Sequence, residues 1–167
     1  MRIIIDTASS HQLGEHALDD LIAPLRHRMM RLFEGRGIEC GWQVSGLETV
    51  GLTASQNLDV LRVLQESLTN VLKHSGATHV RIDLRHLDGS LRLVVEDNGT
   101  GFDRAAVEVR HGLGMRSMQT RAARLGGSLT VRSTEDGTVL TLVVEIRPSA
   151  VVAAEPHDDA LRGVKGS

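Results

Sequence analysis

The stretch of the sequence that decides the fold is Val94-Val95-Glu96-Asp97-Asn98-Gly99-Thr100-Gly101-Phe102. Apolar residues at Leu91, Leu93 and Val95 alternate with other residues, which predicts a strand with one buried face. This strand ends in the carboxylate of Asp97, and the Asn-Gly pair that follows is a strong turn signal because both residues tolerate positive φ. Such an acid can accept a hydrogen bond from a ligand, and the glycines let backbone N–H groups approach that ligand. Taken alone, however, this stretch favours a simpler interpretation, a hairpin turn with a solvated Asp.

The composition is that of an ordinary soluble domain. The chain has 167 residues, of which 41% are hydrophobic and 24% charged, so its length fits one domain with some tail. Aromatic residues make up only 2%, so the core must be built from Leu, Val, Ile and Met. A net charge of −2 gives no indication of a nucleic-acid partner or of direct membrane contact. The single cysteine, Cys40, excludes an internal disulfide, and the sequence contains neither a signal peptide nor a membrane-spanning run, so we expect a cytoplasmic location.

Hydrophobic periodicity on both sides of the opening stretch predicts an alternation of helices and strands. Their order is a helix, a strand, a helix, two strands, a helix and two strands, which favours a two-layer α+β sandwich. Pro24 lies inside the first expected helix, where it is expected to kink the helix or to delay its start. The expected helices are 16–34, a helix capped by Thr53 or Ser55 that runs to about His74, and 112–125; the expected strands are 38–44, 78–85, 91–96, one that begins at Leu129, and 138–146.

A polar face is expected on the second helix. Glu66, Asn70 and His74 are spaced i, i+4 and i+8, so they share a face that differs from the apolar stripe, and Lys73 lies beside it. A carboxylate and a side-chain amide at this spacing suit a hydrated divalent cation, because Mg²⁺ prefers hard oxygen ligands. Taken alone, these residues are more typical of a solvated helix face.

A third polar group lies at the start of the third expected helix, in Gly112-Leu113-Gly114. Glycines at a helix start expose N–H groups at the positive end of the helix dipole, which favours phosphate. A single Gly-x-Gly is weak support for such a site. The three groups in this order, with a short loop between the second and the third, give much stronger support for a phosphate-containing ligand.

With these groups in view, the sequence resembles the catalytic ATP-binding domain of two-component sensor histidine kinases, in the superfamily shared with gyrase and MutL. The resemblance runs from about Leu61 to Val144, roughly half of the chain. Its short loop and its Asn-x-x-Lys-His ending are most similar to the subfamily that pairs with helix-turn-helix response regulators. The matching motifs are the N box at 65–75, the first glycine box at 97–102, the second glycine box at 112–115, the Arg-Ala and Leu-Gly-Gly segments at 121–122 and 125–127, and the Gly-Thr pair at 137–138.

The resemblance implies a Bergerat-type ATP-binding fold, in which helices cover one face of a mixed, mostly antiparallel sheet. It also implies roles at the adenine and the metal. Asp97 would accept a hydrogen bond from the adenine amino group, and Thr138 would support that contact through water. Asn70 would coordinate the Mg²⁺ that bridges the phosphates. Glu66 would polarise the phosphate acceptor or order the metal shell.

Further roles are implied at the phosphates. Lys73 and His74 would lie near them, and Gly112-Leu113-Gly114 would present backbone N–H groups to them. Gly99 and Gly101 would let a lid hinge over the nucleotide. These roles agree with the chemistry, since phosphoryl transfer needs positioning and charge neutralisation more than covalent help.

The sequence departs from the family pattern in one respect that matters. The phosphoacceptor motif, a His followed by an acid on a long dimerisation helix, is not found around His11, His16, His27, His79, His86 or His157. We therefore expect residues 1–15 to be the end of a dimerisation helix or a linker, 16–147 to be the ATP-binding catalytic domain, and 148–167 to be a disordered tail. The expected partners are ATP, a separate dimerisation and phosphoacceptor domain, and a response regulator. The domain would then belong to the cytoplasmic part of a sensor and would not autophosphorylate alone.

Two alternatives remain open from the sequence. The first is a related serine kinase that phosphorylates a protein antagonist, as in the anti-sigma-factor branch; the missing acceptor histidine favours it, whereas the short loop and Lys73-His74 argue against it. The second is a non-catalytic nucleotide-binding module. The presence of both Glu66 and Asn70 argues against this second alternative, because a degenerate site usually loses its metal residues.

Overall fold

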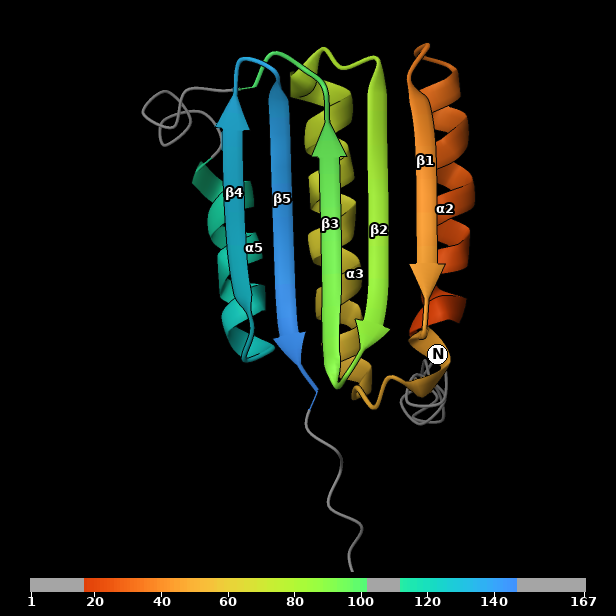
Figure 1. Cartoon of the computed structure of the whole chain (residues 1–167), viewed down its shortest axis with the longest axis vertical. Coiled ribbons are helices and arrows are strands. Elements are labelled where there is room, and N and C mark those ends of the chain that lie inside the picture. The colour runs from red at the N-terminus through yellow and green to blue at the C-terminus, as the bar shows by residue number, and fades with distance from the viewer. Residues whose placement is uncertain (1–16, 102–111, 147–167) are drawn as a thin grey trace, which may run out of the picture.

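Within the described residues, three α-helices cover one face of a five-stranded sheet in the computed structural model of the chain (Figure 1). The structure describes residues 17–101 and 112–146; the expected linker at 1–15, the expected tail at 148–167 and most of the loop expected at 99–111 lie outside them. In chain order the elements are α2 (Leu18–Glu34), β1 (Glu39–Ser45), η1 (Leu47–Thr49), α3 (Ala54–Asn70), η2 (Val71–Ser75), β2 (His79–Leu87), β3 (Ser90–Asp97), α5 (Gly112–Arg124), β4 (Ser128–Thr134) and β5 (Gly137–Glu145).

The sheet is mixed and mostly antiparallel, with the strand order β1-β2-β3-β5-β4. β1 runs parallel to β2, whereas the β2–β3, β3–β5 and β4–β5 pairs are antiparallel. The expected Asp88-Gly89 turn closes the β2–β3 hairpin, and both of its residues have positive φ. Because β5 lies beside β3, Asp97 at the end of β3 faces Thr138 near the start of β5. This register brings together two residues that are far apart in the sequence.

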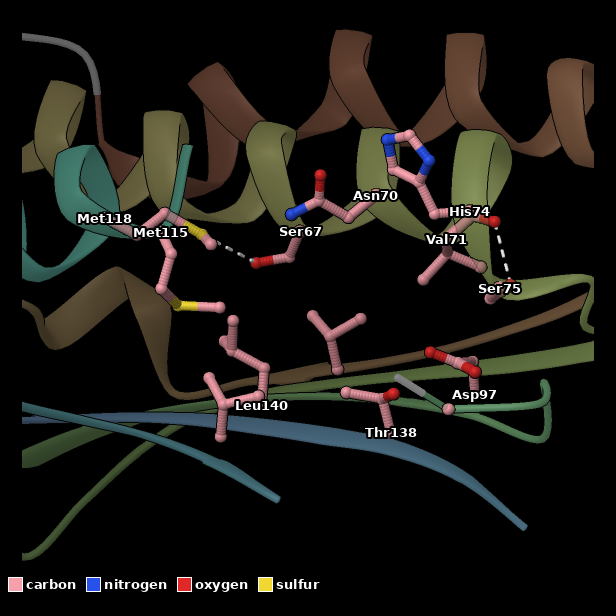
Figure 2. A pocket seen from close by; sticks show the side chains of 13 residues that line it. Ser67, Asn70, Val71, His74, Ser75, Asp97, Met115, Met118, Thr138 and Leu140 are labelled. Carbon is pink, nitrogen blue, oxygen red and sulfur yellow. Dashed lines mark hydrogen bonds between the residues drawn. The ribbon is translucent and has the colours of Figure 1, made fainter. Parts of the chain in front are cut away.

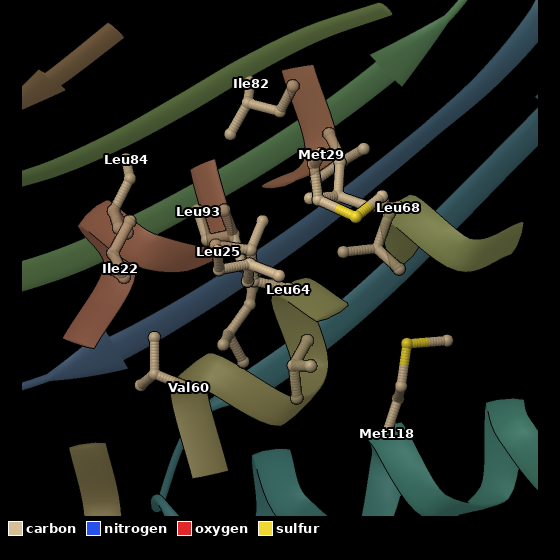
Figure 3. Close-up of a cluster of buried hydrophobic side chains, with 14 of the residues drawn as sticks. Ile22, Leu25, Met29, Val60, Leu64, Leu68, Ile82, Leu84, Leu93 and Met118 are labelled. Carbon is tan, nitrogen blue, oxygen red and sulfur yellow. The ribbon is translucent and has the colours of Figure 1, made fainter. Parts of the chain in front are cut away.

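The core fills the space between the helices and the covered face of the sheet (Figure 3). Alternate residues of β2 and β3 are buried, as expected for strands with one covered face. Aliphatic and Met side chains dominate the core, and Phe33 is its one fully buried aromatic residue among those described. The largest contributions from each element include Ile22, Leu25 and Met29 of α2, Val60, Leu64 and Leu68 of α3, Ile82 and Leu84 of β2, Leu93 of β3, and Met118 of α5. The predicted fold class, a two-layer α+β sandwich with helices on one face, is confirmed.

The two long helices begin for different reasons. α3 begins with a capping box, in which the Thr53 hydroxyl accepts the Gln56 N–H and the Gln56 side chain accepts the Thr53 N–H. α2 has no side-chain cap, but the negative charges of Asp19 and Asp20 in its first turn interact favourably with the positive end of the helix dipole. The expected delay at Pro24 is wrong, because α2 begins at Leu18 and runs through the proline. Pro24 lies on the exposed side, where water can serve the carbonyl that loses its helical donor.

The end of the second long helix differs from the prediction of an α-helix to His74. α3 ends at Asn70, and residues 71–75 form the π-helical turn η2. The Ser75 hydroxyl donates to the Val71 carbonyl at 2.8 Å and accepts the Ala77 N–H at 3.0 Å, so this side chain replaces part of the regular helical bonding. Gly76 then ends the segment in the left-handed conformation. π-Turns are frequent at functional sites, and this one lies beside the end of β3 (Figure 1).

Candidate functional site

Asp97 is a buried carboxylate at the end of β3, and only 8% of the residue is exposed. Its Oδ1 atom accepts the Gly99 N–H at 2.8 Å, which folds the turn back onto the side chain. Burial raises the pKa of the Asp97 carboxyl above its ordinary value, although the backbone N–H groups of Gly99 and Thr138 oppose that rise by stabilising the carboxylate. A buried acid with few partners inside the protein is suited to accept a hydrogen bond from a ligand.

The pocket in front of Asp97 lies between the sheet and the helices (Figure 2). Asp97 and Thr138 enter it from the sheet, and the Thr138 hydroxyl lies 3.1 Å from the Ser133 hydroxyl of β4. Asn70 and His74 line it from the opposite side, at the end of α3 and on η2, and the exposed His74 ring is directed away from the sheet. The pocket therefore places an amide and an imidazole across from a carboxylate and a hydroxyl.

The remaining lining of the pocket is mostly apolar. Met115 and Met118 come from α5, Val95 from β3, Val131 from β4 and Leu140 from β5. The Ser67 hydroxyl of α3 contacts the Met118 sulfur at 3.6 Å, which joins two helices over the pocket (Figure 2). Such a lining, with a few convergent polar groups, is typical of a site for a flat organic ligand.

Glu66 does not line this pocket with Asn70 and His74, so the prediction that the three residues act on one face is only partly right. Glu66 lines a neighbouring polar cavity between α3 and α5, and Met118 borders both spaces. Its carboxylate lies against Gly114 in the first turn of α5, so closely that a methyl group on Gly114 would overlap it. A larger residue at 114 would thus displace the flexible Glu66 side chain from the helix start.

The glycines that follow Asp97 are packed against backbone. A methyl group on Gly99 would overlap the Ser75 carbonyl, and one on Gly101 would overlap the Thr134 carbonyl. The Thr100 N–H also donates to the Ser75 carbonyl at 2.9 Å, so this turn fastens η2 to the end of β3. Close packing is thus a physical reason for both glycines, and their role as lid hinges stays a prediction.

The structure leaves other predicted site residues outside the pocket. Lys73 is exposed on η2 and does not line it. Leu113 is 87% exposed, so its side chain makes no site contact, and any part it plays is through its backbone. Gly112 is the first residue of α5, as expected for a phosphate-binding helix start.

Sequence reasoning missed several residues that shape the site. Ser67, Ser75, Met115 and Met118 line the pocket, although the polar spacing of the N box does not single out any of them. The i, i+3 spacing of the two methionines was the available signal. The Asn-Gly signal predicts only a turn at Asn98, yet its side-chain oxygen accepts the N–H groups of Thr78 and His79 at 3.0 and 2.8 Å. It thereby anchors the start of β2 beside Asp97.

The described residues contain no group of three or more His, Cys, Asp or Glu side chains arranged to hold a metal ion. Mg²⁺ in nucleotide sites takes one or two protein ligands and completes its octahedron with phosphate oxygens and water. Asn70 supplies one hard amide oxygen at the pocket wall, and that donor fits such a partial set.

The sequence places this fold and pocket in a known family. Residues 55–148 match the family of histidine kinase-, DNA gyrase B-, and HSP90-like ATPases, and this match spans more than half of the 167 residues. The chain therefore belongs to that family, and its domain is the catalytic ATP-binding domain of a two-component sensor histidine kinase.

Curated relatives agree with this assignment. Sensor histidine kinase MctS of Rhizobium johnstonii is 40% identical over 139 residues, which cover 81% of this chain and 30% of MctS. The signal transduction histidine-protein kinase/phosphatase UhpB of Salmonella typhimurium is 32% identical over 136 residues, which cover 80% of this chain and 26% of UhpB. The chain thus spans less than a third of the length of these two relatives.

Solved structures support the fold. The histidine kinase domain of the Erythrobacter litoralis blue-light activated histidine kinase superposes with a TM-score of 0.68 at 20% identity, covering 78% of this chain and 61% of that one. Full-length ShkA in complex with AMPPNP gives a TM-score of 0.66 at 22% identity, covering 81% of this chain and 31% of that one. None of the helices that the structure describes has the length and apolar character needed to cross a bilayer.

Proposed function

We propose that this domain binds Mg²⁺-ATP in the pocket at the end of β3 and transfers the γ-phosphoryl group to a histidine outside this chain. The observation that carries the proposal is the buried Asp97 carboxylate, which faces Asn70 across a pocket with a mostly apolar lining. The family assignment and the names of the relatives support the same reaction.

The adenine would occupy the part of the pocket nearest the sheet. Asp97 accepts a hydrogen bond from the exocyclic amino group, and Thr138 supports that contact through a water molecule. Val95, Met115 and Leu140 pack against the ring faces, since they form the apolar lining around the carboxylate. Asp97 would select adenine over a base with a carbonyl in place of the amino group, because that carbonyl would set an acceptor against the carboxylate.

The phosphates would extend toward the start of α5. Asn70 provides a ligand to Mg²⁺, which when bound neutralises charge on the phosphates. His74 lies at the pocket wall and Lys73 is exposed on the same turn, so both can reach the phosphates from η2. Gly112 and Gly114 direct backbone N–H groups of the first helical turn toward them.

In the transfer step, an imidazole nitrogen of the acceptor forms a bond to the γ-phosphorus while the bond to the β,γ-bridging oxygen breaks, and ADP leaves with that oxygen. Glu66 faces a polar cavity beside the nucleotide pocket. From there it either polarises the acceptor imidazole or orders the metal shell. Positioning and charge stabilisation carry the reaction, as is general for phosphoryl transfer.

The acceptor would belong to a dimerisation and phosphoacceptor domain of a longer sensor kinase, and the phosphoryl group would pass from it to a response regulator. The names of the relatives and the partial coverage of their length support this proposal. We place the reaction in the cytoplasm.

The proposal is tested by mixing the domain with a separately prepared dimerisation segment from a relative such as MctS, together with γ-labelled ATP. The expected product is a labelled segment with an acid-labile, base-stable phosphate, as in phosphohistidine. Asn70→Ala should abolish the label, and Asp83→Asn, on the open face of the sheet, should leave it intact. Nucleotide binding without transfer would contradict the kinase proposal, and an acid-stable phosphoserine would support a serine kinase instead.

A further inference from the structure

Asp59 of α3 is held by two arginines of α5. Its side chain is only 4% exposed, and its Oδ1 atom accepts from Arg121 Nη1 at 2.9 Å. Its Oδ2 atom accepts from Arg124 Nε at 3.0 Å, and Arg124 Nη2 also donates to Oδ1. Because both carboxylate oxygens are engaged by groups on one partner helix, this ion-pair cluster fixes α5 relative to α3 in more than one direction.

On both helices the ion-pair cluster lies the same number of residues from the contact between Glu66 and Gly114. Asp59 precedes Glu66 by seven residues on α3, and Gly114 precedes Arg121 by seven residues on α5. The contacts Asp59–Arg121 and Glu66–Gly114 therefore show that α3 and α5 run antiparallel. At 1.5 Å of rise per residue, the two contacts are about 10 Å apart along each helix. The contact of Ser67 with Met118 also joins the two helices.

We propose that Asp59 is a positioning residue for the phosphate end of the site: its ion pairs with Arg121 and Arg124 set the position of α5 along α3, and so hold the first turn of α5 against Glu66. The inference rests on the proposed function, because it takes the start of α5 as the place where phosphate is bound. Asp59 itself lines neither the nucleotide pocket nor the cavity beside Glu66.

The two ends of the nucleotide respond differently to a displacement of α5. Asp97 and Thr138 belong to paired strands of the sheet, so the polar contacts of the adenine do not depend on where α5 lies along α3. Of the residues proposed to pack against its ring, Met115 belongs to α5, whereas Val95 and Leu140 belong to the sheet. The N–H groups of the first turn of α5 move with their helix, and so does the contact between Gly114 and Glu66. Loss of the Asp59 cluster should therefore weaken the phosphate contribution more than it weakens adenosine binding.

The test compares the affinities for adenosine and for Mg²⁺-ATP in the wild type, Asp59→Asn and Asp83→Asn, by titrations followed by NMR. Asp83→Asn is a matched control, because Asp83 also binds an arginine through both oxygens, at 2.5 Å each to Arg85, on the open face of the sheet. The ratio of ATP affinity to adenosine affinity should fall about tenfold in Asp59→Asn. It should be unchanged in Asp83→Asn. The phosphoryl-transfer rate should fall further, up to about a hundredfold, because misplacement of reacting groups is costly.

The ratio separates positioning from general damage. A partly unfolded variant lowers both apparent affinities by the same factor and leaves their ratio unchanged. If Asp59→Asn fails to fold, Arg124→Gln serves instead, since that side chain is 56% exposed and Arg121 keeps Asp59 paired; the ratio should then fall a few-fold. An unchanged ratio in a folded variant would overturn this inference and leave the proposed function standing. Absence of adenosine and ATP binding by the wild type would overturn the proposed function and this inference with it.

Discussion

At the scale of single residues, the environment of Asp97 determines what the site can do. The carboxylate is buried at a strand end, and one of its oxygens is already engaged by the Gly99 N–H. The carboxylate, which the Thr138 N–H also stabilises, lines a pocket with a mostly apolar lining, where a ligand donor gains more from a hydrogen bond than it would in water. The same burial raises the pKa of the carboxyl, so Asp97 ionises less readily than an exposed aspartate.

The raised pKa predicts a pH dependence of ligand binding. Only the ionised carboxylate accepts from the adenine amino group, so the affinity for adenosine should fall as the pH is lowered through the raised pKa of Asp97. Adenosine is the right probe because it carries no titrating phosphate. The measurement is its dissociation constant between pH 4 and pH 8. An affinity that stays constant down to the ordinary pKa of an aspartate would contradict the placement of Asp97 at the base.

The same shift predicts the sign of an effect on stability. A carboxyl whose pKa is raised by folding binds its proton more tightly in the folded state, so the free energy of unfolding decreases as the pH rises from the ordinary pKa through the raised one. Below the ordinary pKa, both states are protonated and this cost vanishes. Asp97→Asn should therefore be at least as stable as the wild type at neutral pH. A gain that persists unchanged at the lowest pH would argue against ionisation as its cause.

Gly101 provides a third prediction at this scale, with Gly126 as its control. The two residues have nearly equal φ, +63° and +65°, so Ala pays the same backbone strain at each, about 1–2 kcal/mol. At Gly101 the new methyl group would also overlap the Thr134 carbonyl, whereas at Gly126 it would meet no atom within 4 Å. Urea unfolding should show a clearly larger loss for Gly101→Ala. Equal losses at both positions would mean that the turn moves freely from β4, as a hinge would.

The sequence alone predicted the polar residues of the site better than its shape. Asp97, Asn70 and Thr138 belong to short motifs, and all three line one pocket. Glu66 was expected beside Asn70 because four residues on a helix place side chains on the same face. In the structure the two residues line neighbouring cavities, and Met118 of α5 borders both. That arrangement depends on how two helices pack, for which no local sequence signal exists.

At the scale of elements, α3 begins with a capping box and is followed by a π-helical turn. The capping box satisfies N–H groups at its first turn, and the π-turn η2 replaces the regular helix at its last one. The sequence predicted the cap because Thr53 stands before an apolar stripe. It could not predict the π-turn, because Ser75-Gly76 is equally compatible with an α-helix that ends. The difference is decided by contacts of Ser75 with Ala77 and Thr100, which form only in the folded protein.

The capping box yields a prediction for helix stability. Thr53→Ala removes the hydroxyl that accepts the Gln56 N–H and should lower the free energy of unfolding by about 0.5–2 kcal/mol. Thr120→Ala is the matched control, since among residues 17–101 and 112–146 the Thr120 hydroxyl bonds only to the Arg116 carbonyl within α5. It should be neutral or slightly stabilising, because Ala favours a helix interior. A Thr53→Ala variant as stable as this control would show that the cap does not hold α3.

At the scale of the whole molecule, the pocket exists because helices cover only one face of the sheet (Figure 1). The end of β3, the end of α3 and the start of α5 are distant in the sequence and meet at one edge of the sandwich. Periodicity predicted these elements and their types. It did not predict that β5 would lie between β3 and β4, because strand order is set by long-range pairing. That order is what places Thr138 beside Asp97.

The measurement that tests the central claim most directly is ATP binding by calorimetry, with and without Mg²⁺, for the wild type and for Asp97→Asn. The Asn carbonyl would keep the bond from the Gly99 N–H and would turn its amide donor toward the adenine amino group. We expect magnesium-dependent binding by the wild type and a loss of about 1–3 kcal/mol in the variant, the cost of an unmet buried polar group. Equal affinity in the two proteins, or no binding by the wild type, would contradict the assignment of this pocket to ATP.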